Sequence, residues 1–100
     1  MKKNLVFIAA LLATILVISL GCGPVESTSL IVQSDTAIQG AKTADAEKKS
    51  PYEYYAAEQY LHKAREKWGT SDFEYSIDYA KDARDLAKKA RERSMKKERD

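Results

Sequence analysis

Two helix-start signals constrain this chain more than any other feature. Ser50 and Ser71 each begin a Ser-x-x-Glu capping box, and the first box has a proline at the first helical position. Gly69, just before the second box, is a residue at which helices commonly end. A connection of about three residues places two helices side by side and antiparallel. The sequence therefore predicts an antiparallel helical hairpin over residues 51–68 and 72–97.

The apolar residues of both arms recur at the spacing of one helix face. In the first arm this stripe comprises Tyr54, Ala57, Leu61, Ala64 and Trp68. In the second arm it comprises Phe73, Ile77, Ala80, Ala83 or Arg84, Ala87 and Ala90, with Tyr79 and Leu86 beside it. These two faces are expected to pack against each other as the inside of the hairpin.

A further helical pattern precedes the hairpin over residues 28–48. It contains Gly40, which costs about 1 kcal/mol relative to alanine inside a helix. It must end before Pro51, because the residue before a proline disfavours helical backbone. The expected fold class is therefore all-α, with this N-terminal helix and the hairpin forming a small three-helix bundle.

The core of such a bundle would be thin. Residues 22–100 contain eleven alanines but only nine Leu, Ile, Val or Phe residues. Alanine lets helix axes approach to about 8 Å, yet it buries little area. The tyrosines and Trp68 are therefore expected to provide much of the buried surface. Because a single small core seldom supplies more than about 3–5 kcal/mol, either the N-terminal helix or a partner should complete it.

Charge and length restrict the classes of function. Residues 22–100 carry 15 acidic and 15 basic side chains, a balance that argues against a nucleic-acid binder. The chain is also too short to build a walled enzyme pocket. His62 is the only histidine, and Glu58 on the preceding turn would be a second ligand of a weak site at best. We expect no catalytic residues, no metal and no cofactor.

The N-terminus resembles a secretory leader. Lys2 and Lys3 precede an uncharged run over residues 5–20, which is followed by Gly21 and Cys22. As a helix this 16-residue run would span about 24 Å, less than the hydrocarbon core of about 30 Å. An uncleaved anchor in which the cysteine is incidental remains the alternative.

The position of the lone cysteine resembles the bacterial lipoprotein signal. That resemblance implies cleavage before Cys22 and acylation of this residue, although Ser19 departs from the leucine common at its position. Gly23 stands where an aspartate would retain enterobacterial lipoproteins at the inner membrane, so the resemblance implies the outer membrane, facing the periplasm. The expected organisation is a signal peptide (1–21), a lipidated cysteine with its tether (22–29), a helical domain (30–97) and a tail (98–100).

The hairpin sequence resembles a known family. Residues 51–66 and 71–83 carry a Pro-x-x-Tyr…Leu-x-x-Ala block followed by Asp-Phe-Glu. This pattern is similar to that of short, alanine-rich bacterial envelope lipoproteins classed as a domain of unknown function. The likeness covers roughly residues 30–92, and its second half is also similar to a tetratricopeptide hairpin. It implies a lipid-anchored helical protein of the cell envelope and brings no catalytic residues.

Tyrosines gather at the start of the first arm. Tyr54 belongs to the inner stripe, whereas Tyr52 and Tyr55 point elsewhere, and Tyr60 follows one turn later. They either pack against the N-terminal helix or form an aromatic face for a protein partner or a glycan. Seven bases from Lys88 onward complement the helix dipole, or attract anionic lipid or acidic wall polymer.

These observations predict a non-enzymatic, lipid-anchored envelope protein that acts as a helical docking or structural module. Its partners would be the membrane, through Cys22, and another envelope protein or a second copy of the chain. Tyr52, Tyr55 and Tyr60 are the candidate partner face. The alternative is a tether that binds peptidoglycan or another wall polymer through the tyrosines and the basic tail. No nucleic acid is expected.

Overall fold

The computed structural model describes residues 2–20 and 22–99, without the side chains of residues 18–22. This part of the chain is all-α, with no strand, as the sequence predicts. Its helices are α1 (Lys2–Leu20), α2 (Cys22–Thr43), α3 (Ala46–Lys49), α4 (Pro51–Gly69) and α5 (Phe73–Arg99). The hairpin arms correspond to α4 and α5, which confirms the antiparallel pair expected over residues 51–68 and 72–97.

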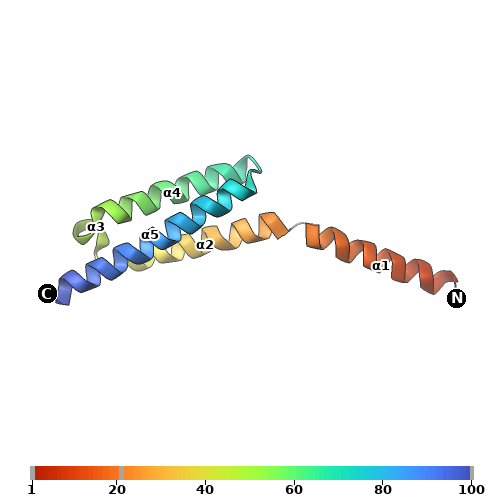
Figure 1. Cartoon of the computed structure of the whole chain (residues 1–100). Helices are drawn as coiled ribbons and strands as arrows, with labels where there is room; N and C mark the ends of the chain where they lie inside the picture. The colour runs from red at the N-terminus through yellow and green to blue at the C-terminus, as the bar shows by residue number, and fades with distance from the viewer. Residues whose placement is uncertain (1, 21, 100) are drawn as a thin grey trace.

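Three helices form the bundle, and α5 is its centre (Figure 1). It contacts α2 along one side and α4 along the other, while α2 and α4 contact each other less. In Figure 1, α2 and α5 run in the same direction, and α4 runs in the opposite direction. The short α3 turns the chain from α2 into α4. The small three-helix bundle predicted from the sequence is therefore observed.

Helix α1 lies outside the bundle (Figure 1). Among the described residues it contacts only α2, and its large apolar side chains from Leu5 to Val17 are exposed. The chain is elongated as a result, with principal extents of 73 × 27 × 14 Å. In the part of the chain that the structure describes, no helix combines the length and the hydrophobicity that a membrane span requires.

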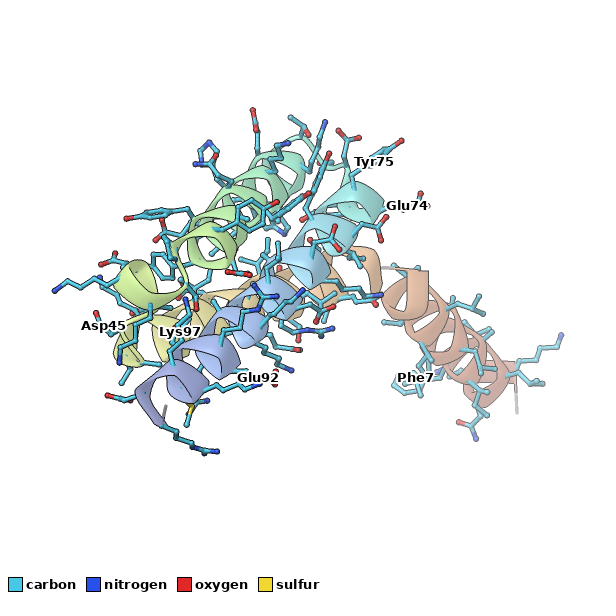
Figure 2. The ribbon with its side chains drawn as sticks, turned by 60° about the vertical axis from the view of Figure 1, so that its left-hand side comes forward. Phe7, Asp45, Glu74, Tyr75, Glu92 and Lys97 are labelled. Carbon is cyan, nitrogen blue, oxygen red and sulfur yellow. The ribbon has the colours of Figure 1, made fainter. Side chains whose placement is uncertain are left out.

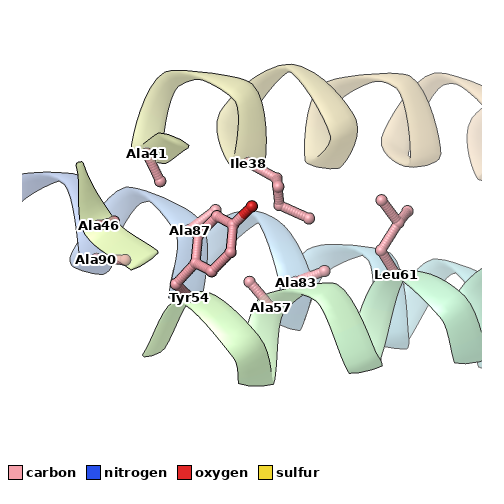
Figure 3. Packing of buried hydrophobic residues seen from close by; sticks show 9 residues of the cluster. All are labelled: Ile38, Ala41, Ala46, Tyr54, Ala57, Leu61, Ala83, Ala87 and Ala90. Carbon is pink, nitrogen blue, oxygen red and sulfur yellow. The ribbon is translucent and has the colours of Figure 1, made fainter. Parts of the chain in front are cut away.

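The inner face of α5 consists entirely of small residues. Its fully buried members are Ser76, Ala80, Ala83, Ala87, Ala90 and Ser94. Because these side chains are small, α2 and α4 approach α5 closely, and larger residues from those helices fill the remaining space. Figure 3 shows Ile38 of α2 and Tyr54 and Leu61 of α4 converging in front of the α5 alanines.

Hydroxyl groups join the helices inside this core. The Ser27 and Ser76 Oγ atoms lie 2.6 Å apart, and Ser76 also donates to the Ala64 carbonyl at 2.8 Å. Ser34 donates to the Ala80 carbonyl at 2.5 Å, so α2 is bonded to α5 at two levels. Burying a hydroxyl without a partner is costly. Among the described residues, no buried side-chain nitrogen or oxygen lacks a partner.

The N-terminal helix differs from its expected range of 28–48. It begins at Cys22, so the segment 22–29 that we expected to be a tether is helical. Pro24 is tolerated there because the N–H groups of the first helical turn have no carbonyl acceptor within the helix, so the N–H that proline lacks is not missed. Ser27 is fully buried against α5, and the contact between its hydroxyl and that of Ser76 stabilises the helical conformation of this segment. The helix stops at Thr43 because Asp45 adopts a left-handed backbone (φ 63°), after which α3 begins.

The first capping box marks the start of α4, whereas α5 begins at Phe73, one residue later than the second box predicts, and the serine of the first box does not act as a side-chain cap. The Ser50 hydroxyl makes no cap bond and accepts instead from Ser94 Oγ at 3.1 Å. Gly69 is the last residue of α4 and has no positive φ, whereas Ser71 takes the left-handed position (φ 63°). The end of α4 is closed around Ser71, whose N–H donates to the Trp68 carbonyl at 3.1 Å, and by the Asp72 N–H, which donates to the Lys67 carbonyl at 2.8 Å.

Three predictions about the core are wrong. Trp68 is 46% exposed because its indole N–H reaches across to Thr28 Oγ1 at 3.1 Å instead of entering the α5 seam. Phe73 and Ile77 are only half-buried, since Ser76 occupies the seam one turn further on. The tyrosines also contribute less than expected: only Tyr54 is buried. The core is therefore built of alanine, serine and a few aliphatic residues.

Candidate functional site

The predicted lipidation site lies outside the described side chains. Cys22 begins α2, and its backbone is helical, but its side chain is not described. The residues around it are placed such that α1 and the bundle lie on opposite sides of it (Figure 1). Among the described side chains, the core clusters draw on α2, α3, α4 and α5 and include no residue of α1. Removing residues 1–21 would therefore leave the core contacts unchanged.

The three candidate tyrosines all lie on α4 but face different surroundings. Tyr52 is 80% exposed and Tyr55 is 53% exposed, because both lie on the outer side of the helix. The Tyr55 ring meets the buried Tyr54 ring edge-to-face, with centroids 5.4 Å apart. Burial raises the pKa of the Tyr54 phenol well above its usual value, and the nearby Glu58 and Glu47 carboxylates raise it further. Tyr54 is thus a neutral core residue, and Tyr52 and Tyr55 are surface residues.

Tyr60 belongs to a different surface, the seam between α4 and α5. Its ring stacks against Tyr79 of α5 with centroids 5.9 Å apart and an interplanar angle of 30°. The Lys63 ammonium lies 5.9 Å from the Tyr60 centroid and 5.6 Å from that of Tyr79. Both rings are therefore half-buried and covered by a cation, which stabilises the hairpin. The structure groups Tyr52 with Tyr55 and separates Tyr60 from them.

Two exposed aromatic residues at the loop end of the hairpin, Trp68 and Tyr75, were not predicted to be surface residues. Tyr75 is 61% exposed, and the Lys67 ammonium lies 5.8 Å from its ring centroid. Trp68, assigned to the core from its spacing, is also on the surface. Figure 2 shows Tyr75 pointing outward from the first turn of α5. Its position outside both apolar stripes was a signal that could have identified it as a surface residue.

Basic side chains gather at the opposite end of the bundle, where α3, the start of α4 and the end of α5 meet. Figure 2 shows Lys97 at this end. An open depression of about 550 Å³ is lined there by Lys49, Ser50, Pro51, Tyr52, Glu53, Arg93, Lys96 and Lys97. Several of these charges are engaged. Arg93 pairs with Glu53, Lys97 donates to the Lys49 carbonyl, and Lys49 pairs with Glu98 at 3.3 Å.

His62 lies on the surface where α2 and α4 face each other. It lines an open depression of about 500 Å³ together with Asp35, Glu58 and Arg65, and Arg65 pairs with Asp35 at 3.6 Å. A further depression, of about 410 Å³, lies on the α4–α5 side and includes Tyr60, Asp82 and Asp85. No group of three or more His, Cys, Asp or Glu side chains suited to a metal ion occurs within the described residues.

The comparison with protein families matches residues 29–100 to a domain of unknown function, DUF4398. This chain belongs to the DUF4398 family. The match covers α2 from Ser29 onward and the whole of α3 to α5 in the described chain, so most of the bundle belongs to the DUF4398 domain of this protein. Comparison with curated proteins gives no match, and comparison with solved structures gives none.

Proposed function

We propose that this DUF4398 protein is a non-enzymatic docking module of the bacterial cell envelope, anchored by lipid at Cys22 on the outer membrane and facing the periplasm. The observation that supports docking is the position of the aromatic residues. Eight aromatic residues follow Cys22, and all except Tyr54 lie outside the buried core. Tyr60 and Tyr79 pack against the edge of the core, whereas Tyr52, Tyr55, Trp68 and Tyr75 are exposed.

Aromatic side chains on a surface suit binding to a partner. Each brings a large contact area at a small cost in conformational entropy, and tyrosine and tryptophan dominate the energetics of many interfaces. Tyr52 and Tyr55 have no cation covering their rings within the described residues, unlike Tyr60, Tyr75 and Tyr79. We therefore assign the partner face to Tyr52 and Tyr55 and leave Tyr60 to the hairpin seam.

Lipid anchoring is supported by the leader sequence and by the independence of the bundle from α1. A charged start, an apolar run and Gly21-Cys22 match the lipoprotein pattern. Two or more acyl chains hold a protein durably on a bilayer, at about 0.8 kcal/mol per buried CH₂. Because the core includes no α1 residue, cleavage before Cys22 is compatible with the fold.

The decisive experiment combines anchoring and crosslinking in intact cells. Cys22→Ser should abolish acylation, and the protein should remain uncut or leave the membrane fraction. A photo-crosslinking residue at Tyr55 should capture an envelope protein, whereas the same residue at exposed Lys81, on α5, should not. Normal processing and fractionation of the Cys22→Ser variant would refute the anchor. Absence of a protein adduct at Tyr55 would refute the docking face.

A wall-polymer tether is the second candidate, and the basic depression at the α3 end favours it. In Figure 1 this end is the one farthest from α1, and the 27 residues of α5 separate the two ends of the bundle by about 40 Å. On a protein anchored at Cys22, these bases would point away from the membrane and toward the wall. Peptidoglycan carries carboxylates that such bases attract.

Co-sedimentation of residues 23–100 with isolated cell wall tests this candidate. Binding should weaken as salt rises, because the contacts are between charges. Lys96→Glu should weaken it further, while Lys42→Glu, an equal change on exposed α2 surface, should have little effect. Equal binding by both variants, or no binding at any salt concentration, would remove this candidate.

A further inference from the structure

The groove between α2 and α5 differs from the other surfaces of the bundle. It has a volume of about 380 Å³, and its α2 side is lined by Val32, Gln33, Thr36, Ala37 and Gly40. Arg84, Lys88 and Arg91 of α5 line its other side. None of the described carboxylates lines it, whereas each of the three depressions described above includes at least one. The groove is therefore uncharged and partly apolar along α2, which we call its floor, and positive along α5.

Most of this positive charge is uncompensated. Arg84 pairs with Asp85 at 3.2 Å and donates to Gln33 Oε1 at 3.3 Å. Within the described part of the chain, neither Lys88 nor Arg91 makes a hydrogen bond or an ion pair. The spacing from Arg84 to Lys88 to Arg91 is four and three residues, so the bases form one row along α5 over about 10 Å.

Gly40 is a second, independent observation. Glycine inside a helix costs about 1 kcal/mol relative to alanine, so a glycine there usually has a packing reason. The packing within this chain supplies none. A Cβ atom at Gly40 would meet only the Arg91 side chain, at 3.7 Å and 3.9 Å, which is ordinary contact. The missing side chain instead lowers the floor of the groove, where a further element could approach the α2 backbone closely.

Exposed aliphatic side chains continue the same surface. Val32 is 59% exposed at the groove, and Val25 (71% exposed) precedes it by seven residues, on the same side of α2. Met95 (39% exposed) follows Lys88 by seven residues, on the same side of α5. Val25, Val32 and Met95 are the large aliphatic residues that the bundle exposes in its described part. They extend an apolar strip beyond both ends of the basic row.

We infer that the α2–α5 groove binds an acidic amphipathic helix of another envelope protein. The apolar floor would receive the apolar face of that helix, and its carboxylates would pair with Arg84, Lys88 and Arg91. Two parallel helices with small residues between them can accept a third at close range, which would complete a four-helix arrangement. The inference deepens the proposed docking function, on which it rests, and it names a second face and the chemistry of its partner.

Photo-crosslinking on the full chain in intact cells tests this inference. The crosslinking residue replaces Thr36, an exposed residue of the groove, and mass spectrometry identifies the captured segment. We expect a segment with helical periodicity and acidic residues three and four apart. Combining Lys88→Glu with Arg91→Glu should reduce the adduct at least tenfold. Lys42→Glu with Lys48→Glu, an equal charge change on exposed residues outside the groove, should leave the yield unchanged.

Reversing the charges on both the groove and its partner provides a more specific test. Replacing the captured acidic residues of the partner by lysine should restore the adduct of the Lys88→Glu, Arg91→Glu chain. Matching thermal melts of the variants and the parent would show that the bundle remains folded. Adducts to a second copy, to lipid or to a segment without carboxylates would overturn the inference, as would an adduct that survives the charge reversal.

The outcome is separable from that of the proposed function. If Tyr55 still captures a protein while Thr36 captures none, the groove inference fails and the docking module stands. If Thr36 captures an acidic helix while Tyr55 captures nothing, the aromatic face is refuted and the groove is the docking site. Loss of both adducts from a chain present in the membrane fraction would refute both.

Discussion

The two seams of α5 share one row of small residues but are held together differently. Toward α4, the row meets Tyr54 and Leu61, and an ion pair between Arg93 and Glu53 crosses the seam. Toward α2, the row meets Leu30 and Ile38 together with buried serines that donate or accept across the interface. The α4 seam also has hydroxyl bonds, from Ser76 to the Ala64 carbonyl and from Ser94 to Ser50, but among the described residues it alone combines them with a buried aromatic ring and an ion pair.

The comparison shows why a row of alanine and serine can serve both neighbours. Because the side chains of this row are small, the space between the helices is filled by side chains of the opposite helix. A tyrosine can therefore fill it on the α4 side and a pair of hydroxyls on the α2 side. The α4 seam gains more transfer free energy because larger side chains are buried there. The α2 seam gains specificity of register, because each buried serine must find its partner.

Truncating the one large buried side chain of the α4 seam should have the largest effect. Tyr54→Ala should lower the free energy of unfolding by about 4 kcal/mol, as large aromatic-to-alanine changes in cores do. Tyr55→Ala, one residue on and exposed, should cost less than about 1 kcal/mol. Thermal and urea melts of residues 23–100 would measure both, and equal losses would contradict the placement of Tyr54 inside the bundle.

Overpacking the shared row should come next. Ala80 is fully buried between α2 and α4, so Ala80→Leu should destabilise the bundle by about 2 kcal/mol. The control is Lys81→Leu, which points about 100° away and is exposed. Should the Ala80→Leu protein melt as high as the parent in calorimetry, α5 would have to be rotated from its observed orientation.

Removing a hydroxyl from the α2 seam should have a smaller effect. Ser76→Ala leaves the Ser27 hydroxyl and the Ala64 carbonyl without their partner and should cost about 1–2 kcal/mol. The Ser27→Ala, Ser76→Ala double variant should cost less than the sum of the single variants, because no orphaned hydroxyl remains. A double-mutant cycle from denaturant melts checks this coupling, and strict additivity would mean that the hydroxyls do not interact.

The smallest expected effect is a gain. Gly40→Ala should raise the free energy of unfolding by about 0.5–1 kcal/mol, since helix propensity improves and the new methyl makes only ordinary contact with Arg91. Calorimetry of the parent and the variant would show this as a higher melting temperature. A lower melting temperature would mean that α2 approaches α5 more closely at this point than the structure shows.

The sequence by itself determined the helical class, the antiparallel α4–α5 hairpin and the start of α4. It did so because capping residues, Pro51 and the repeat of apolar residues act locally, within one or two turns. It also singled out Cys22 through the pattern around it, and lipidation at this residue stays a prediction. The identity of Tyr54 as an inner residue followed from its spacing to Ala57 and Leu61, and the structure confirms it.

Only the tertiary structure decided which residues at equivalent spacing became the core. Phe73 and Ser76 stand seven and four residues before Ala80, on the same face of α5, and Ser76 is buried because Ala64 and Ser27 supply its hydrogen bonds. Trp68 turns outward because Thr28, 40 residues earlier, accepts its indole N–H. The α2–α5 groove likewise depends on the distance between two helices that are far apart in sequence. Such outcomes depend on long-range partners, which a local pattern does not specify.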